Sequence, residues 1–264
     1  MINRNISTLS SLPVRVIARL DVKKPNVVKG INLEGLRIVG DPGVLAKKYQ
    51  QQGVDELVFI DSVASLYKRN TVFEVIENVA KRLRVPFTVG GGINSIEGVS
   101  TLLNKGADKV LINTDAVNNP KLIKEAAKIF GSQCLVISIE AKYNKKANKW
   151  IAYTDNGREN TNIDVFRWVQ EVEALGAGEI FITSVDNDGM QKGFDIDLCR
   201  QILDLTKLPV IVSGGAGCLD DVLEVVRSCS PSGVALGSLL HYEKTDVGQV
   251  KKFLSSHTVN VRPV

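Results

Sequence analysis

The stretches VPFTVGGGI (residues 85–93) and LPVIVSGGAG (residues 208–217) decide the fold. Each is a short apolar run, as expected of a buried strand, that stops abruptly in glycines. Backbone N–H groups at such a strand end are open to an anion. Some twenty residues further on, ADKVLINT (residues 107–114) and SGVALGS (residues 232–238) are two more apolar runs that end in small polar residues. The two sets are offset by about 120 residues, which predicts a two-fold repeated scaffold with two phosphate sites and a substrate phosphorylated at both ends.

Strand-like runs alternate with amphipathic, helix-like runs along the whole chain. The helix-like runs include residues 40–53, 71–83, 120–131, 164–176 and 220–229. Eight β/α units with no polar linker predict a single (β/α)₈ barrel over residues 13–264, preceded by an N-terminal extension over residues 1–12. A doubly wound open sheet is the alternative, but the even spacing and the half-repeat favour closure. The predicted strands span residues 14–20, 56–60, 87–89, 109–112, 135–139, 179–183, 210–212 and 234–236.

The composition is that of a soluble globular protein. Hydrophobic residues make up 44% of the 264 residues and charged residues 23%, which disfavours disordered and membrane classes. The net charge is only +4, without a basic block, so nucleic-acid binding has little support and phosphorylated small molecules fit equally well.

The cysteines predict neither disulfides nor a metal site, because they are scattered, form no CxxC pair and have no neighbouring histidine. With only two histidines in the chain, we expect no metal ion and no cofactor. The N-terminal residues contain no apolar segment long enough for a signal peptide, which predicts a cytoplasmic protein. The cysteines are Cys134, Cys199, Cys218 and Cys229.

Two acids occupy matching positions in the two halves of the chain. RLDVK (residues 19–23) corresponds to IEAK (residues 139–142), which places Asp21 and Glu140 at the end of the first strand of each half. Because the strand ends of such a barrel form its catalytic face, both acids are expected in one mouth, where paired carboxyl groups can serve as general acid and base. The alternative is that each acid caps a helix or forms a surface ion pair.

Small polar residues stand beside both glycine turns. Asn113, Thr114 and Ser238 can add side-chain hydrogen bonds to the same phosphate oxygens, and VDNDGMQKG (residues 185–193) offers Asp188 and Gly189 beside the second turn. The alternative is that the glycines merely allow tight turns.

Several sequence segments, spread over nearly the whole chain apart from about ten N-terminal residues, are similar to one known family. These segments are LDVK…VVKG (20–30), DELVFID (55–61), PFTVGGGI (86–93), GADKVLINT (106–114), GAGEIFITSVDNDG (176–189), LPVIVSGGAG (208–217) and VNVR (259–262). Through them the chain resembles the HisF family, the cyclase subunits of imidazole glycerol phosphate synthase.

The resemblance implies a lyase of histidine biosynthesis that takes ammonia from a glutamine amidotransferase (HisH-like) docked on the N-terminal face of the barrel as a heterodimer. Ammonia attacks a bis-phosphorylated aminoimidazole carboxamide ribonucleotide, which is cleaved and cyclised to imidazole glycerol phosphate. Asp21 matches one catalytic aspartate, and we expect it to act as general acid with Glu140 as general base. Lys29 matches the lysine of a mobile first loop. One phosphate site is matched by Gly92, Asn113 and Thr114, and the other by Asp188, Gly189, Gly215, Gly237 and Ser238.

At the opposite end the resemblance implies a charged ring where ammonia enters, and Asp108 matches a residue of the amidotransferase docking face. Two basic and two acidic side chains can satisfy one another across the narrow bottom of a barrel, as buried charges require. The ring can serve as a gate for ammonia; the alternative is that these four side chains only close the bottom of the barrel as a structural plug. The ring residues are Arg15, Glu56, Lys109 and Glu179.

Two positions depart from the family pattern. Glu140 stands where the family has aspartate, and the extra methylene moves its carboxylate by roughly 1 Å. Arg19 stands where the family usually has a small side chain, and strand alternation points it into the barrel, where we expect it to pair with Glu140. Leu111 and Phe181 are expected to face inward as well.

These departures leave two alternatives to the cyclase. One is a HisF-like paralogue that works with an amidotransferase on another substrate, such as an amidino sugar. The other is a catalytically degenerate barrel that activates an amidotransferase, although a pure scaffold has no need of two phosphate sites.

Overall fold

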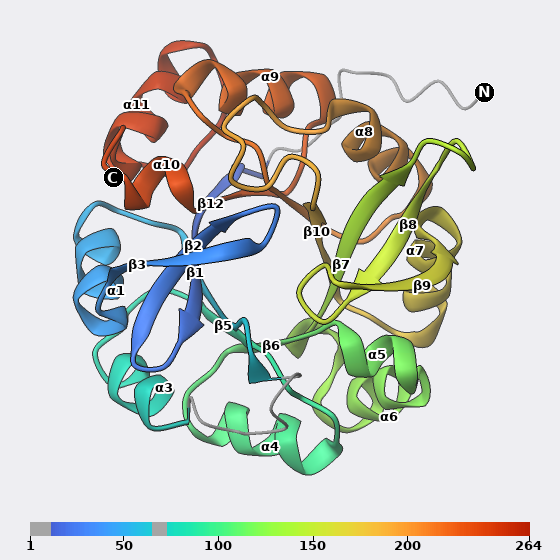
Figure 1. The fold of residues 1–264 in the computed structure, drawn as a ribbon. Coiled ribbons are helices and arrows are strands. Elements are labelled where there is room, and N and C mark those ends of the chain that lie inside the picture. Colours follow the sequence, from blue (N-terminus) through green and yellow to red (C-terminus); the bar gives the residue numbers. More distant parts are fainter. Residues whose placement is uncertain (1–11, 65–72) are drawn as a thin grey trace.

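Eight parallel strands close into a barrel in the computed structural model, which describes residues 12–64 and 73–264 (Figure 1). They pair in the order β10-β11-β12-β1-β4-β5-β6-β7, and β7 pairs with β10 to close the ring. Each predicted strand begins within one residue of an observed one, so the predicted (β/α)₈ barrel is confirmed. The strands are β1 (Arg15–Lys23), β4 (Glu56–Asp61), β5 (Phe87–Gly90), β6 (Lys109–Ile112), β7 (Leu135–Asn144), β10 (Glu179–Ser184), β11 (Val210–Ser213) and β12 (Gly233–Leu236). The two-fold repeat stays a prediction, and residues 1–11 of the predicted extension lie outside the described residues.

Helices surround the barrel, and local sequence signals set their ends. Asp164 begins α7 by accepting hydrogen bonds from the amides of Phe166 and Arg167, and Gly176 ends it at φ 100°. The described helices are α1 (Pro42–Gln51), α3 (Phe73–Ala80), α4 (Ile96–Asn104), α5 (Thr114–Asn118), α6 (Lys121–Phe130), α7 (Val165–Leu175), α8 (Ile196–Leu205), α9 (Leu219–Cys229), α10 (Ser238–His241) and α11 (Val247–Ser256), with a 3₁₀ turn, η2 (Ser132–Cys134).

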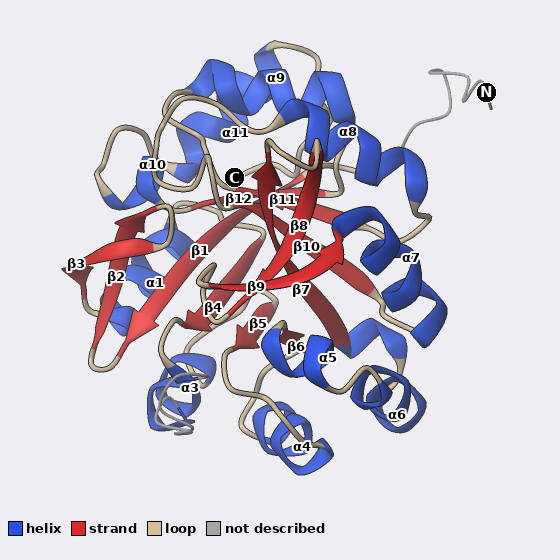
Figure 2. Cartoon of the chain, turned by 45° about the vertical axis from the view of Figure 1, so that its right-hand side comes forward, coloured by secondary structure: helices blue, strands red, loops and turns tan. Residues whose placement is uncertain are grey.

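Two antiparallel strand pairs extend the barrel and are absent from the sequence-based prediction. β2 (Asn26–Ile31) and β3 (Glu34–Gly40) follow β1, and β8 (Lys149–Thr154) and β9 (Glu159–Asp164) follow β7 (Figure 2). The segment that the resemblance implies is a mobile first loop is therefore an antiparallel strand pair here, because β2 pairs with the end of β1 and β3 pairs with β2.

The inside of the barrel holds an apolar layer that is separate from the core between sheet and helices. Leu111 and Phe181 belong to this layer, as their predicted inward direction requires. It lies between the first residues of the strands and the acids at their ends. The members are Ile17, Val58, Leu111, Val136, Phe181, Ile211 and Ala235.

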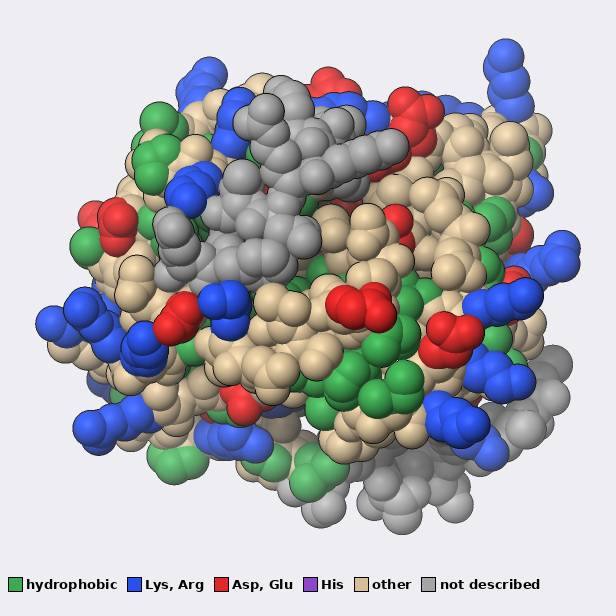
Figure 3. Space-filling model, turned by 90° about the horizontal axis from the view of Figure 1, so that it is seen from below, with side chains coloured by type: hydrophobic (Ala, Val, Ile, Leu, Met, Phe, Trp, Pro, Cys, Tyr) green, Lys and Arg blue, Asp and Glu red, His purple; other side chains and the backbone are tan. Residues whose placement is uncertain are grey.

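The surface shows no gathering of one charge on the face seen in Figure 3, where acidic and basic side chains are interspersed. Within residues 12–64 and 73–264, no helix is long and apolar enough to cross a membrane.

Candidate active site

The two acids lie at the mouth of the barrel, each where a barrel strand runs on into an antiparallel pair. Asp21 lies opposite Val28 of β2, and Glu140 lies opposite Tyr153 of β8. Both side chains are buried, with exposed fractions of 4% and 8%. Both acids therefore lie at strand ends of the barrel, where the sequence places them.

Asp21 is held by two cations. Its Oδ1 accepts a hydrogen bond of 2.8 Å from Arg19 Nε, and its Oδ2 lies 3.5 Å from Lys29 Nζ. Burial raises the pKa of Asp21, but the charges of Arg19 and Lys29 outweigh burial and leave this pKa below its usual value. Asp21 is therefore a carboxylate at neutral pH.

Glu140 has the opposite electrostatic setting. Its Oε2 accepts a hydrogen bond of 2.7 Å from the amide of Gly157, in the turn between β8 and β9. Burial raises the pKa of Glu140 to about 7, against the opposing influence of the Gly157 amide and of Arg19. Glu140 therefore stays largely protonated up to a pH of about 6, where Asp21 is already ionised, and loses its proton around pH 7.

Replacing Glu140 by glutamine is expected to stabilise the fold more at pH 8 than at pH 5, by on the order of 2 kcal/mol. The folded chain keeps the Glu140 proton up to a pH of about 7, whereas the unfolded chain loses it near pH 4.5. Wild-type stability therefore falls between these two pH values, and glutamine, which stays neutral, removes this loss. Urea titrations of both proteins at the two pH values measure the difference, and an equal effect at pH 5 and pH 8 would contradict it.

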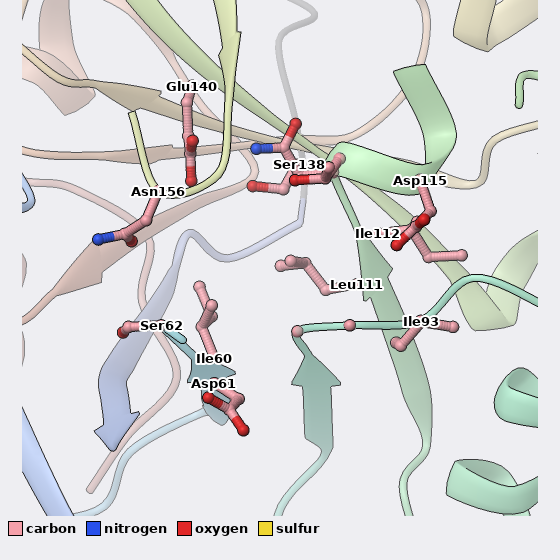
Figure 4. Close-up of a pocket in the computed structure, with 14 residues that line it drawn as sticks. Ile60, Asp61, Ser62, Ile93, Leu111, Ile112, Asp115, Ser138, Glu140 and Asn156 are labelled. Carbon is pink, nitrogen blue, oxygen red and sulfur yellow. The ribbon is translucent and has the colours of Figure 1, made fainter. Parts of the chain in front are cut away.

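The first predicted phosphate site shares a pocket with Glu140 (Figure 4). Gly91, Gly92, Asn113 and Thr114 line this pocket together with Glu140. A side chain at Gly91 would place its Cβ 2.6 Å from the carbonyl oxygen of Asp61, and Gly91 has φ 107°, so only glycine fits there. Asn113 and Thr114 bond to the backbone of the β8–β9 pair through Tyr153 O (3.3 Å) and Asp155 N (3.1 Å).

The second predicted site is built where β10, β11 and β12 end. A Cβ at Gly215 would lie 2.0 Å from the carbonyl oxygen of Gly193, and one at Gly189 would lie 2.2 Å from that of Gly30. A Cβ at Gly237 would lie 3.5 Å from Lys29 Cε. Ser238 follows as the buried first residue of α10. The glycines therefore allow the backbones to approach closely around this site.

Lys29 differs from its expected setting, since it is buried on β2 with an exposed fraction of 3%. Its Nζ donates to Asp188 Oδ1 at 2.6 Å, so it joins the second phosphate site to Asp21. The turn after β2 is fixed on the far side of the mouth, because Asn32 Nδ2 donates to the carbonyl oxygens of Val185 and Asp186 at 2.8 Å each.

The two antiparallel pairs meet over the mouth. Asn156 Nδ2, in the β8–β9 turn, donates to the carbonyl oxygen of Leu33, in the β2–β3 turn, at 2.8 Å. Leu33 is buried, with an exposed fraction of 2%. The segment expected to be a loop therefore covers the acids in this structure.

Arg19 faces inward as predicted, with an exposed fraction of 3%, but the predicted pairing with Glu140 is wrong. Among the described residues, the carboxylates within 4.0 Å of its guanidinium belong to Asp21 (2.8 Å) and Asp188 (3.7 Å). The reason is local: Glu140 turns to the Gly157 amide, while Asp21 lies two residues away on the same face of β1.

The predicted charged ring is present at the opposite end of the barrel. Its members are the first residues of β1, β4, β6 and β10. Lys109 Nζ lies 2.7 Å from a carboxylate oxygen of both Glu56 and Glu179, and Arg15 pairs with the same two acids, at 2.8 Å from Glu56. Each carboxylate therefore joins both cations in a closed ring.

Asp108 precedes the ring residue Lys109 and is exposed on the same face. Its Oδ2 accepts a hydrogen bond of 2.8 Å from the amide of Phe87, which fixes the side chain.

Sequence reasoning missed one connected pair behind the site. Tyr49 hydroxyl lies 2.7 Å from His241 Nδ1, and His241 Nε2 lies 3.0 Å from the carbonyl oxygen of Arg19. The sequence offers only one hint of this pair, which is that His241 is one of just two histidines in the chain. Among the described residues, no group of three or more His, Cys, Asp or Glu side chains is arranged to hold a metal ion.

Known proteins similar to this chain include subunits of imidazole glycerol phosphate synthase. A family described as "Histidine biosynthesis protein" matches residues 15–246. The chain is 50% identical over 248 residues to the imidazole glycerol phosphate synthase subunit HisF of Geobacillus kaustophilus, which covers 94% of this chain and 98% of the relative. It is 47% identical over 251 residues to the subunit of the same name from Prochlorococcus marinus (strain MIT 9312), covering 95% and 98%. The corresponding subunit of Clostridium beijerinckii is 46% identical over 248 residues, covering 94% and 98%.

Proposed function

Because the chain belongs to the HisF family of imidazole glycerol phosphate synthase subunits, we propose that it is the ammonia-using cyclase, a lyase, of this step in histidine biosynthesis. Its substrate is a bis-phosphorylated aminoimidazole carboxamide ribonucleotide, which is cleaved and cyclised to imidazole glycerol phosphate. The observation that carries the proposal is the pair of buried carboxyl groups, Asp21 and Glu140, at the barrel mouth between two glycine-lined sites.

The proton-transfer roles follow from the charges around the two acids. Addition of ammonia releases a proton from nitrogen, and cleavage of the substrate requires a proton on the departing group. Asp21, kept ionised by Arg19 and Lys29, suits the acceptor, and Glu140, kept protonated by burial, suits the donor. This assignment is the reverse of the one expected from the sequence, where Asp21 was the acid.

The phosphates of the substrate bind at the two ends of the mouth. Gly92, Asn113 and Thr114 bind one phosphate beside Glu140. The other phosphate binds near Lys29, at the site formed by Asp188, Gly189, Gly215, Gly237 and Ser238. A phosphate there competes with Asp188 for the Lys29 ammonium, so substrate binding and the ion pair are linked.

Ammonia enters through the charged ring from a HisH-like glutamine amidotransferase bound to the N-terminal face as a heterodimer. The ring has equal numbers of positive and negative groups, and the apolar layer lies between it and Asp21. Uncharged ammonia crosses such a layer at a far lower desolvation cost than ammonium. Asp108 contributes to the docking face.

The identities of 46–50% to HisF subunits favour the cyclase over the two alternatives drawn from the sequence. The proposal is tested by assaying the purified chain with the bis-phosphorylated ribonucleotide and ammonium salt across pH. The turnover per unit of neutral ammonia is expected to fall above a pH of about 7, as Glu140 loses its proton. Glu140→Gln is expected to lower the rate and to remove this basic limb. A wild-type rate that keeps rising with the fraction of neutral ammonia, with no basic limb, would contradict the donor role of Glu140.

A further inference from the structure

We propose that Arg19 is a positioning residue for Asp21, which it holds in a single orientation as the proton acceptor of the reaction. The inference rests on the proposed function and deepens it, because it gives a role to the side chain that departs from the family pattern. Four kinds of observation carry it: the contact with Asp21, the anchoring of the guanidinium, the anchoring of the Arg19 backbone, and the charges that face Asp21.

The contact with Asp21 is short and fully buried. Arg19 Nε donates to Asp21 Oδ1 at 2.8 Å, and the two side chains have exposed fractions of 3% and 5%. The second cation, Lys29, approaches Asp21 Oδ2 only to 3.5 Å and is drawn toward Asp188 at 2.6 Å. Arg19 therefore supplies the stronger contact, and only it contacts Oδ1 among the residues that the structure describes.

The guanidinium is itself fixed across the barrel. Its Nη1 donates to Thr183 Oγ1 at 3.1 Å on β10 and to Ser213 Oγ at 3.2 Å on β11. The ring of Phe181 lies beneath it, with the guanidinium carbon 5.8 Å from the ring centroid. A planar group with several donors in fixed directions can make these contacts at once, which a lysine ammonium cannot reproduce.

The backbone of Arg19 is held as well. Its carbonyl oxygen can only accept, so His241 Nε2 carries the hydrogen of their 3.0 Å contact, and Tyr49 hydroxyl donates to His241 Nδ1 at 2.7 Å. Burial lowers the pKa of His241 to about 4, so this imidazole is neutral and keeps one tautomer near neutral pH. Both ends of the residue that orients Asp21 are therefore fixed.

The charges around Asp21 make Arg19 decisive for its protonation. Lys29 on β2 is its other cation, and Glu140 on β7 and Asp188 after β10 are acids, of which Asp188 is shared by both cations. His241 on α10 is neutral. Removing Arg19 leaves Asp21 with one cation that Asp188 also binds, so the pKa of Asp21 rises.

The test replaces Arg19 and follows pH dependence as well as rate. In Arg19→Gln, the acidic limb of ammonia-dependent kcat/KM is expected to move up by at least about one pH unit, with kcat at pH 7 lowered at least about tenfold. Arg19→Lys keeps the positive charge but loses the planar guanidinium with its several donors. The acidic limb of its kcat/KM profile should therefore stay near the wild-type position while kcat falls. A Thr183→Val, Ser213→Ala double variant removes two anchors of the guanidinium but keeps the guanidinium itself. We expect it to lower kcat at least about threefold without moving the acidic limb of the kcat/KM profile.

A second readout needs no turnover. The carboxyl carbon of Asp21, labelled with carbon-13 and assigned with Asp21→Asn, is titrated by NMR in wild type and in Arg19→Gln. Its midpoint is expected to rise by at least about one unit. If kcat falls in Arg19→Gln while both the acidic limb of kcat/KM and this NMR midpoint stay in place, the role of Arg19 is merely structural and the inference is overturned.

If the wild-type chain has no cyclase activity but the NMR midpoint moves, the proposed function fails, while the effect of Arg19 on Asp21 stands. Should Arg19→Gln not fold, unchanged kcat in the double variant overturns the positioning.

Discussion

Replacing Asp21 by asparagine is expected to lower ammonia-dependent turnover by about a thousandfold or more. Asparagine keeps the shape of the side chain but cannot accept a proton, and a positioned base contributes on the order of 10² to 10⁴ in rate. The exposed fraction of 4% leaves little room for water to take over this role. The loss is expected in kcat, since neither predicted phosphate site includes Asp21. Steady-state kinetics with ammonium salt measure kcat, and the dissociation constant of the substrate shows whether binding is retained.

Asp115→Asn is the matched control for this variant. Asp115 lines the pocket that contains Glu140, and burial together with the negative charge of Asp155 raises its pKa. The same exchange of a carboxyl for an amide there is expected to change kcat by less than about tenfold, because nothing in the proposed proton transfer uses it. If Asp21→Asn lost no more activity than Asp115→Asn, Asp21 would not be the base.

Replacing Lys109 by methionine is expected to lower glutamine-dependent turnover of the complex at least tenfold while ammonium-dependent turnover changes less than threefold. Lys109 joins Glu56 and Glu179 at 2.7 Å each, so its loss leaves two buried carboxylates facing Arg15 alone. Such a charge imbalance costs several kcal/mol unless the ring rearranges or takes up a proton. Under the proposed function, ammonia from the partner passes through this ring, whereas ammonia from solution can also reach the mouth directly. The two turnover numbers are measured on the same reconstituted complex.

Lys105→Met gives the control for the loss of a lysine. Lys105 pairs with Glu77 at 3.0 Å, and both side chains are about a third exposed or more. Such a surface pair contributes little, so both turnover numbers are expected to stay near wild type. An equal loss of both activities in Lys109→Met would indicate a structural plug in place of a gate.

The barrel could be predicted from the sequence because its strands are buried on both faces. Runs such as those of β4, β7 and β10 are nearly continuous in apolar residues, and each is bounded by turn signals. The charged ring was implied by the resemblance to the family, and the fold explains why it forms. Residues that begin parallel barrel strands lie at one end of the barrel, where Arg15 and Lys109 pair with the acids that begin β4 and β10.

The two antiparallel pairs could not be predicted, and this accounts for the error at Arg19. β3 and β9 are largely exposed, so neither carries the pattern of a buried strand, and their pairing depends on the strands beside them. The turn between β8 and β9 supplies the Gly157 amide that binds Glu140. The sequence alone does not show this contact, so the prediction paired Glu140 with Arg19 instead. Strand alternation gave the direction of the arginine, while the choice among Asp21, Glu140 and Asp188 depended on contacts far apart in the sequence.

The central claim is that Asp21 and Glu140 carry out the ammonia-dependent cyclase reaction between two phosphate sites. The most direct measurement is formation of imidazole glycerol phosphate by the purified chain from the bis-phosphorylated ribonucleotide and ammonium salt, compared with Asp21→Asn. The account predicts saturable turnover by the wild-type chain and a loss of about a thousandfold or more in the variant, with substrate binding retained. Binding of the ribonucleotide without turnover by the wild-type chain, or equal turnover by both proteins, would contradict it.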